Sequence, residues 1–193
     1  MSLFRTPAHG RRGAGTALAA AGAIALLLSG CAGGVPAPSP SPSADAAKPI
    51  FASDEEALAA LETAYGSFLA VSTAVTAESG ASPERLKAVA DGAALQDELS
   101  AAERFSADGL RTSGTIEFSI QELQSTDYAK GARVSAYVCD DISGLDLLDS
   151  SGSSLVLDGR VVKIPYTVVV QGEQPESMKV VERALWEREN FCL

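Results

Sequence analysis

Hydrophobic residues recur at helical spacing in the first part of the region that follows Ser53. They fall on one side of a helix: Leu58, Leu61, Tyr65, Phe68, Leu69 and Val75. Ser53 and Glu56 form a capping-box pattern that predicts where this helix begins. A second helix is predicted from Ser82 to Gly92, with Pro83 in its first turn, and a third over 93–107. The pattern therefore predicts three N-terminal helices.

From Thr112 onward the hydrophobic period changes to two, which is typical of half-buried strands. The inward positions of three predicted strands are Ile116, Phe118 and Ile120, then Val134, Ala136 and Val138, then Val162, Ile164, Tyr166, Val168 and Val170. Pro165 predicts a local edge or a bulge in the third of these strands. A last strand is predicted over 178–188, but its alternation is untidy and its inner face stays unassigned. Helices followed by four or more antiparallel strands indicate an α+β fold.

The first thirty residues have the layout of an export signal. Arg5, Arg11 and Arg12 precede an apolar segment over 17–28, and no acidic residue lies among them. Twelve helical residues span roughly 18 Å, which is shorter than a hydrocarbon core of about 30 Å. We therefore predict a signal peptide over 1–30 and no permanent transmembrane helix there.

The end of this apolar segment reads Leu28-Ser29-Gly30-Cys31 and resembles the lipobox of bacterial lipoproteins. The resemblance implies a diacylglycerol thioether on Cys31, cleavage after Gly30, and acyl chains such as palmitate that anchor the chain to the extracytoplasmic face of the cell membrane. Two acyl chains give stable anchoring where one gives only marginal binding. The alternative is an ordinary secretory signal in which Cys31 is incidental.

A tether rich in proline and serine follows Cys31. Such a composition favours extended polyproline conformations, and residues 32–49 would reach roughly 55 Å at about 3.1 Å per residue. We therefore predict three parts: a signal peptide over 1–30, a lipidated cysteine and tether over 31–52, and a single α+β domain over 53–193.

Charge and histidine content exclude several classes of function. Without the three arginines of the leader, 12 basic residues stand against 25 acidic ones, a net charge of −13. Such a surface repels nucleic acid. The single histidine, His9, lies in the leader, so the mature chain has no Ser-His-Asp or Cys-His catalytic site and no histidine-based metal site.

Cys139 and Cys192 remain when Cys31 is assigned to the lipid. An even number of cysteines in an oxidising compartment predicts one disulfide, Cys139–Cys192. Two free thiols or a redox pair are the alternatives, although the C-x-x-C spacing of a redox pair is absent.

Aromatic and acidic residues supply candidate sites. Four aromatic residues are candidates for a ligand pocket, or for simple core: Tyr65, Phe68, Tyr166 and Trp186. The residue types that acid–base catalysis in a cone-shaped fold would need are present at six positions, two of them already named: Glu117, Glu122, Asp140, Tyr65, Tyr137 and Tyr166. The acids Asp140, Asp141, Asp146 and Asp149 do not match a calcium loop, and we interpret them as a solvated face. We predict no catalytic residue, cofactor or metal.

The order of elements resembles the cone-shaped fold of the nuclear-transport-factor-two-like superfamily, which includes ketosteroid isomerases. That resemblance implies three helices packed on a curved sheet, and it implies a homodimer as one candidate assembly. The segments AYVCDDISGLDLLDSSG and ALWERENFC resemble small actinobacterial lipoproteins of uncharacterised function. The matching residues are Cys139, Asp141, Ser143, Asp149, Gly152, Trp186, Phe191 and Cys192. This second resemblance implies the same location, fold and disulfide, and it implies no activity.

The sequence therefore favours a membrane-anchored extracytoplasmic lipoprotein that acts as a non-enzymatic binding or scaffolding module. Its predicted partners are the membrane, through Cys31, and a protein. Two alternatives stay open: a carrier of a small apolar ligand, and a cone-fold enzyme that uses Asp or Glu with Tyr for acid–base chemistry.

Overall fold

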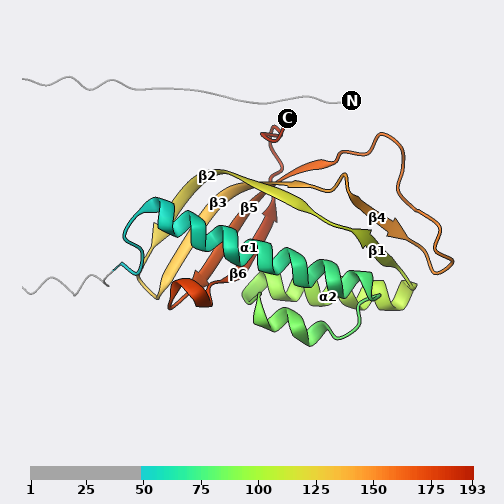
Figure 1. The fold of residues 1–193 in the computed structure, drawn as a ribbon, viewed down its shortest axis with the longest axis horizontal. Helices are drawn as coiled ribbons and strands as arrows, with labels where there is room; N and C mark the ends of the chain where they lie inside the picture. The colour runs from blue at the N-terminus through green and yellow to red at the C-terminus, as the bar shows by residue number, and fades with distance from the viewer. Residues whose placement is uncertain (1–48) are drawn as a thin grey trace, which may run out of the picture. The chain divides into compact units, whose positions relative to one another are not determined.

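The computed structural model describes residues 49–193, and in Figure 1 their helices lie on one face of an antiparallel sheet. The elements in chain order are α1 (Asp54–Ala77), η1 (Pro83–Ala88), α2 (Gly92–Asp108), β1 (Arg111–Gly114), β2 (Glu117–Asp127), β3 (Ala132–Asp141), β4 (Leu145–Leu148), β5 (Lys163–Gly172), η2 (Pro175–Ser177) and β6 (Lys179–Leu185). The mixed α+β class is confirmed. The predicted signal peptide, the lipidation site Cys31 and most of the tether lie outside the described residues.

Helix α1 begins where the capping pattern predicts. The Ser53 hydroxyl accepts a hydrogen bond from the Glu56 backbone N–H at 3.3 Å, and the Glu56 carboxylate accepts one from the Ala52 N–H at 2.6 Å. These bonds satisfy donors that a helix start leaves unpaired. The predicted inward face is buried at Leu61 and Phe68. By length and composition α1 would pass as a membrane span, but this apolar face packs in the core, so we assign it as a core helix.

The predicted second helix is instead the six-residue 3-10 helix η1, so the prediction of three full helices was wrong in this element. Directly after η1 the backbone becomes extended, because Ala90 forms a parallel bridge with Val180 of β6. Asp91 then caps α2, with its carboxylate accepting from the Gly92 N–H at 2.7 Å. A longer helix would remove the backbone groups that pair with β6.

The strands form a four-stranded antiparallel sheet in the order β2-β3-β5-β6 and a two-stranded sheet of β1 and β4. The registers show that these sheets belong to one long bent hairpin. Gly114 pairs with Leu145, and three residues later Glu117 pairs with Asp141. Thus β1 and β2 form one arm of this hairpin, and β3 and β4 form the other.

The bend between the two sheets depends on Gly114. Its φ is +99°, and a Cβ built there would lie 1.9 Å from the carbonyl oxygen of Gly144. A side chain at this position would clash with the other arm, and its backbone conformation favours glycine. Sequence analysis did not predict β4, which is a four-residue strand just after the bend.

The core lies between α1 and one face of the four-stranded sheet, here called the core face. The predicted inward positions Val134, Ala136 and Val138 of β3 are fully buried, as are Val168 and Val170 of β5. These residues pair across the sheet, with Val138 opposite Tyr166 and Val134 opposite Val170. The alternation therefore predicted the inner face of both central strands correctly.

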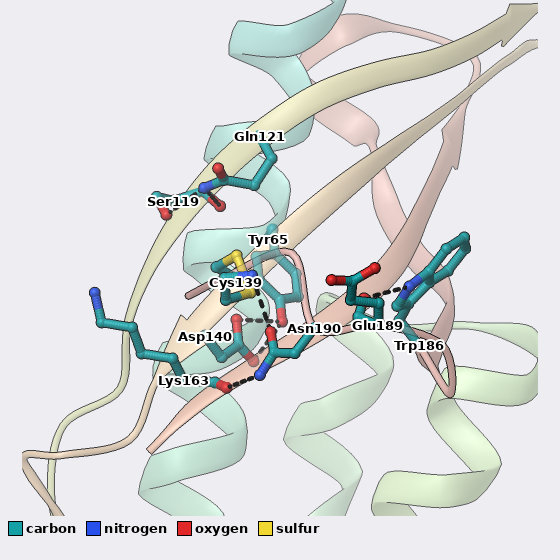
Figure 2. The surroundings of a disulfide bond; sticks show 10 residues. Tyr65, Ser119, Gln121, Cys139, Asp140, Lys163, Trp186, Glu189 and Asn190 are labelled. Atoms are coloured by element: carbon teal, nitrogen blue, oxygen red, sulfur yellow. Dashed lines mark hydrogen bonds between the residues drawn. A yellow bond between two sulfur atoms is a disulfide. The ribbon is translucent and has the colours of Figure 1, made fainter. Parts of the chain in front are cut away.

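The opposite face of the sheet, here called the outer face, is partly covered by the C-terminal segment. Cys139 and Cys192 form the predicted disulfide, with an S–S distance of 2.01 Å. Figure 2 shows Asn190 beside it, where its side-chain amide donates to the Lys163 carbonyl at 3.1 Å. The predicted last strand therefore ends early, at Leu185, and the residues after it fold back as a covalently held tail.

Reduction of the disulfide is expected to lower the free energy of unfolding by about 4 kcal/mol, because the bridge closes a loop between cysteines 53 positions apart. Urea unfolding with and without reductant measures this difference. The variant Cys139→Ala/Cys192→Ala is the control, and its stability should not respond to reductant. Equal stability of the wild-type chain in both conditions would contradict the structural role of the bridge.

Candidate functional site

A buried cluster of polar side chains joins three elements at the core face. Asp140 of β3 is fully buried, and the Tyr65 hydroxyl of α1 donates to its carboxylate, lying 2.9 and 2.8 Å from the two oxygens. Figure 2 shows these two side chains pointing toward each other. Arg183 of β6 donates through Nη2 to Asp140 Oδ2 and through Nε to the Tyr65 hydroxyl at 2.9 Å. We call these three residues the ion cluster.

Tyr166 completes the surroundings of the ion cluster. The guanidinium carbon of Arg183 lies 3.6 Å from the centroid of its ring, which is a cation–π contact. Only 21% of the Arg183 side chain is exposed. Burial disfavours the charge on Arg183, but Tyr65, Tyr166 and Asp140 raise its pKa above its ordinary value. Arg183 therefore stays charged and neutralises the buried carboxylate.

Burial also acts on the Tyr65 hydroxyl. It raises the pKa of this group well above 10.0, and the charge on Asp140 acts in the same direction, while Arg183 opposes both. The hydroxyl consequently keeps its proton and remains a donor to Asp140 over the whole neutral range.

The ion cluster is poorly suited to acid–base catalysis. Both Asp140 oxygens accept hydrogen bonds within the cluster, and the carboxylate forms an ion pair with Arg183. A general base must be able to take a proton from a substrate within hydrogen-bond reach. A polar cavity of about 420 Å³ does include Asp140 in its wall, together with Glu117, Ser119 and Lys163. The bonded carboxylate, however, points toward Tyr65 and Arg183.

The structure brings together three of the residues that sequence analysis named for acid–base chemistry, namely Tyr65, Asp140 and Tyr166. The other three, Glu117, Glu122 and Tyr137, lie at outer-face positions of β2 and β3. Arg183 was not among the candidate residues predicted from the sequence. The signal for it was the untidy alternation of the last strand, because Arg183 occupies an inward position where an apolar residue is expected.

The four aromatic residues named as a candidate pocket lie on two sides of the sheet. Tyr65 and Phe68 stack in the core with ring centroids 5.9 Å apart, and Tyr166 lies on the same side. Trp186 packs on the outer face against Tyr137, at 4.9 Å, and Phe191, at 5.9 Å. The four residues therefore do not surround one space.

The residues named for the resemblance to small lipoproteins lie in β3, in the turns after it and in the C-terminal tail. The Asp141 carboxylate accepts from the Ser143 N–H at 2.9 Å, and that of Asp149 accepts from the Ser151 N–H at 2.8 Å. These side-chain bonds stabilise tight turns and lower the pKa of both carboxyls. Asp141 and Asp149 thus each stabilise a turn.

The acidic residues do not form a metal site in residues 49–193, where no group of three acidic, cysteine or histidine side chains is placed to hold an ion. The interpretation of Asp140 as part of a solvated face was wrong, because its side chain is fully buried. It belongs to the core face, where the ion pair with Arg183 and the hydrogen bond from Tyr65 offset the cost of burying its charge.

An apolar groove lies between the C-terminal half of α1 and the bend of the long hairpin. Its volume is about 460 Å³, and it is lined by Gly66, Leu69, Ala70, Thr73, Ala74, Ala77, Gly114, Thr115, Ile116 and Phe118. The small residues of α1 leave this space open: a Cβ built on Gly66 would already lie 3.6 Å from the Phe118 ring.

Comparison with known proteins establishes similarity of fold alone. No family model matches the chain, and no curated protein matches it. The intermembrane space region of the chloroplast protein ARC6 matches with a TM-score of 0.50 and 16% identity, over 65% of this chain and 92% of that one. At this identity the match supports the α+β architecture and carries no function.

The substitution Asp140→Leu is expected to destabilise the domain by about 3–5 kcal/mol, because it leaves the Arg183 charge partly buried without a partner. The double variant Asp140→Leu/Arg183→Met should regain much of this loss. Chemical denaturation of the three proteins measures both effects.

The exposed pair of Arg133 and Glu182, 3.3 Å apart with each side chain nearly half exposed, supplies a matched control. Glu182→Gln should cost less than about 1 kcal/mol. Strictly additive effects in the Asp140 and Arg183 variants would contradict the coupling that we infer.

Alkaline pH is expected to destabilise the domain through Tyr65. In the folded state the pKa of Tyr65 is raised, so its contribution is complete below about pH 10, where tyrosine is also protonated in the unfolded chain. Above that pH the unfolded chain releases the proton, and stability falls. Unfolding measured from pH 8 to pH 11 should show this decline, and Tyr65→Phe should make it shallower. An identical decline in Tyr65→Phe would rule out Tyr65 as the cause.

Proposed function

We propose that this chain is a lipid-anchored extracytoplasmic protein whose folded domain acts as a non-enzymatic binding or scaffolding module. The observation that carries the proposal is the ion cluster. Asp140 is the carboxylate that a cone-fold enzyme would need beside tyrosines, and its oxygens are bonded to Tyr65 and Arg183 instead. A group held in this way supports the fold and is not free for proton transfer.

The proposed location rests on the lipobox-like segment that ends at Cys31, and the disulfide supports it. Disulfides persist in oxidising spaces and are rare in the cytosol of most organisms. The covalent bond between Cys139 and Cys192 thus agrees with export of the domain. Anchoring of Cys31 in the bacterial cell membrane would hold the domain near that surface through the proline-rich tether.

The cone-like arrangement also belongs to the proposal. It is supported by α1, which crosses the core face of the four-stranded sheet in Figure 1, and by the bend that turns β1 and β4 away from that sheet. Members of the cone-shaped superfamily often dimerise through the sheet, so a homodimer remains a candidate assembly.

A carrier of a small apolar ligand is the second candidate function. The groove of about 460 Å³ favours it, because this volume lies within the range of about 300–1,000 Å³ that is typical of ligand sites. The lining is mainly apolar, and no acidic side chain contributes to it.

Native mass spectrometry of the mature lipoprotein, released from membranes in detergent, tests these proposals together. We expect a diacylglyceryl group on Cys31, a mass two hydrogens lower from the disulfide, and no other small molecule. The Cys31→Ser variant is the control and should carry no lipid and remain unprocessed.

The other outcomes of this measurement are equally decisive. An unlipidated wild-type chain that is cleaved elsewhere would contradict the anchor. A retained small molecule would favour the carrier if it is released by Ala70→Phe, which narrows the apolar groove.

A further inference from the structure

The two edges of the four-stranded sheet differ in how the chain covers them. At β6 the Val180 N–H donates to the Val89 carbonyl at 3.0 Å, and the Val180 carbonyl accepts from the Asp91 N–H at 2.9 Å. The segment between η1 and α2 therefore pairs with this edge at the start of β6. At the other edge, and within residues 49–193, the strand-to-strand backbone bonds of β1 and β2 run to β4 and β3 alone.

The open edge is long, and the bend between Gly114 and Glu117 divides it into two parts. Because β1 and β2 are one arm of the bent hairpin, their free side extends from Arg111 to Asp127. Unpaired N–H and C=O groups along such an edge are a template for pairing with another strand. The register shifts within β2, after Ile120 and after Leu123, interrupt this template without covering it.

The apolar groove borders the same arm. Thr115, Ile116 and Phe118 belong to the bend and the start of β2, and they form the strand side of the groove. Gly66, Ala70 and the following small residues of α1 form its other side. A strand added to the open edge would therefore place alternate side chains against the groove.

The outer-face side of the open arm is acidic. Glu117, Glu122 and Asp127 occupy outer-face positions of β2, and residues 112–127 contain no lysine or arginine. A strand beside them is favoured if its own outer-face side chains are basic, because opposite charges on neighbouring strands attract.

We propose that the open edge of β1 and β2, together with the apolar groove, binds an extended segment of a partner protein in which apolar residues alternate with basic ones. The apolar side chains enter the groove, the basic ones face Glu117, Glu122 and Asp127, and the backbone extends the sheet. This inference rests on the proposed binding function and gives it a partner chemistry.

Charge argues against a second copy of this chain as the occupant. Symmetric antiparallel pairing of β2 about Glu122 would place that residue opposite its own copy and Glu117 opposite Asp127 of the other molecule. Like charges directly opposite each other on neighbouring strands are destabilising. The acidic row thus disfavours self-pairing while it attracts a basic segment.

The test uses the mature lipoprotein in nanodiscs of neutral phosphatidylcholine, with empty nanodiscs as the blank. The probe is a short fluorescent peptide that alternates lysine with valine. We expect saturable binding that weakens as salt is added, and slower amide hydrogen exchange in residues 112–127. A peptide with glutamate in place of lysine, and one with alternate backbone nitrogens methylated, should bind at least about tenfold more weakly.

Matched variants localise the binding. Ala70→Phe fills the groove and should weaken binding about tenfold, whereas Ala59→Phe changes an exposed alanine of the same helix outside the groove and should not. Glu122→Lys should weaken binding about fivefold at low salt, and the exposed Glu103→Lys on α2 should leave it unchanged.

Four results would overturn the inference: no binding by the folded lipoprotein, equal binding of the methylated peptide, equal losses in Ala70→Phe and Ala59→Phe, or a dimer whose 112–127 amides are protected without peptide. The last result would make a second copy the occupant. Failure of peptide binding in a lipoprotein that is still lipidated and free of small molecules would refute this partner chemistry alone. A missing lipid or a retained ligand would instead refute the proposed function.

Discussion

The bonds among Asp140, Tyr65 and Arg183 hold together elements that are far apart in the chain. Tyr65 lies 75 positions from Asp140 and 118 positions from Arg183. A buried carboxylate without its partner would cost several kcal/mol, so arrangements that separate these residues are strongly disfavoured. The ion cluster therefore fixes where α1 crosses β3, and it fixes the register of β6, because a slip of one residue would turn Arg183 to the outer face.

The sequence patterns predicted correctly the parts of the fold that depend on interactions between residues close together in the chain. The capping residues located the start of α1, and the alternation in β3 and β5 identified Val138 and Val168 as inward residues. Even the parity of the cysteines predicted the disulfide. The errors lie where contacts between distant parts of the chain determine the structure. The helix η1 is short because Ala90 pairs with β6, and Asp140 is buried because its carboxylate forms an ion pair with Arg183. Neither contact leaves a local signature.

The candidate site illustrates the same limit. Sequence analysis named Tyr65, Asp140 and Tyr166 as residue types without knowing that they meet, and it lacked Arg183, which decides their role. With a neutral polar group at that position the same carboxylate and tyrosine would resemble an acid–base pair. The charge of one inward arginine turns them into a structural cluster. The chemical role of Asp140 and Tyr65 therefore depends on their contact with Arg183, which residue types alone do not reveal.

The ion cluster in the core also bears on the bend of the long hairpin and on the groove beside it. Because the ion cluster fixes α1 and the four-stranded sheet from within, the hairpin can bend at Gly114 without loosening the core. Beyond the bend β1 still contacts the end of α1, where the hydroxyls of Thr112 and Thr76 lie 2.8 Å apart. The close approach of Gly114 to Gly144 places the bend in the wall of the apolar groove, next to an edge that residues 49–193 leave without a paired strand. Within residues 49–193 the sheet is paired at the start of β6 and open along β2, where a partner strand would find both a backbone to pair with and a groove to fill.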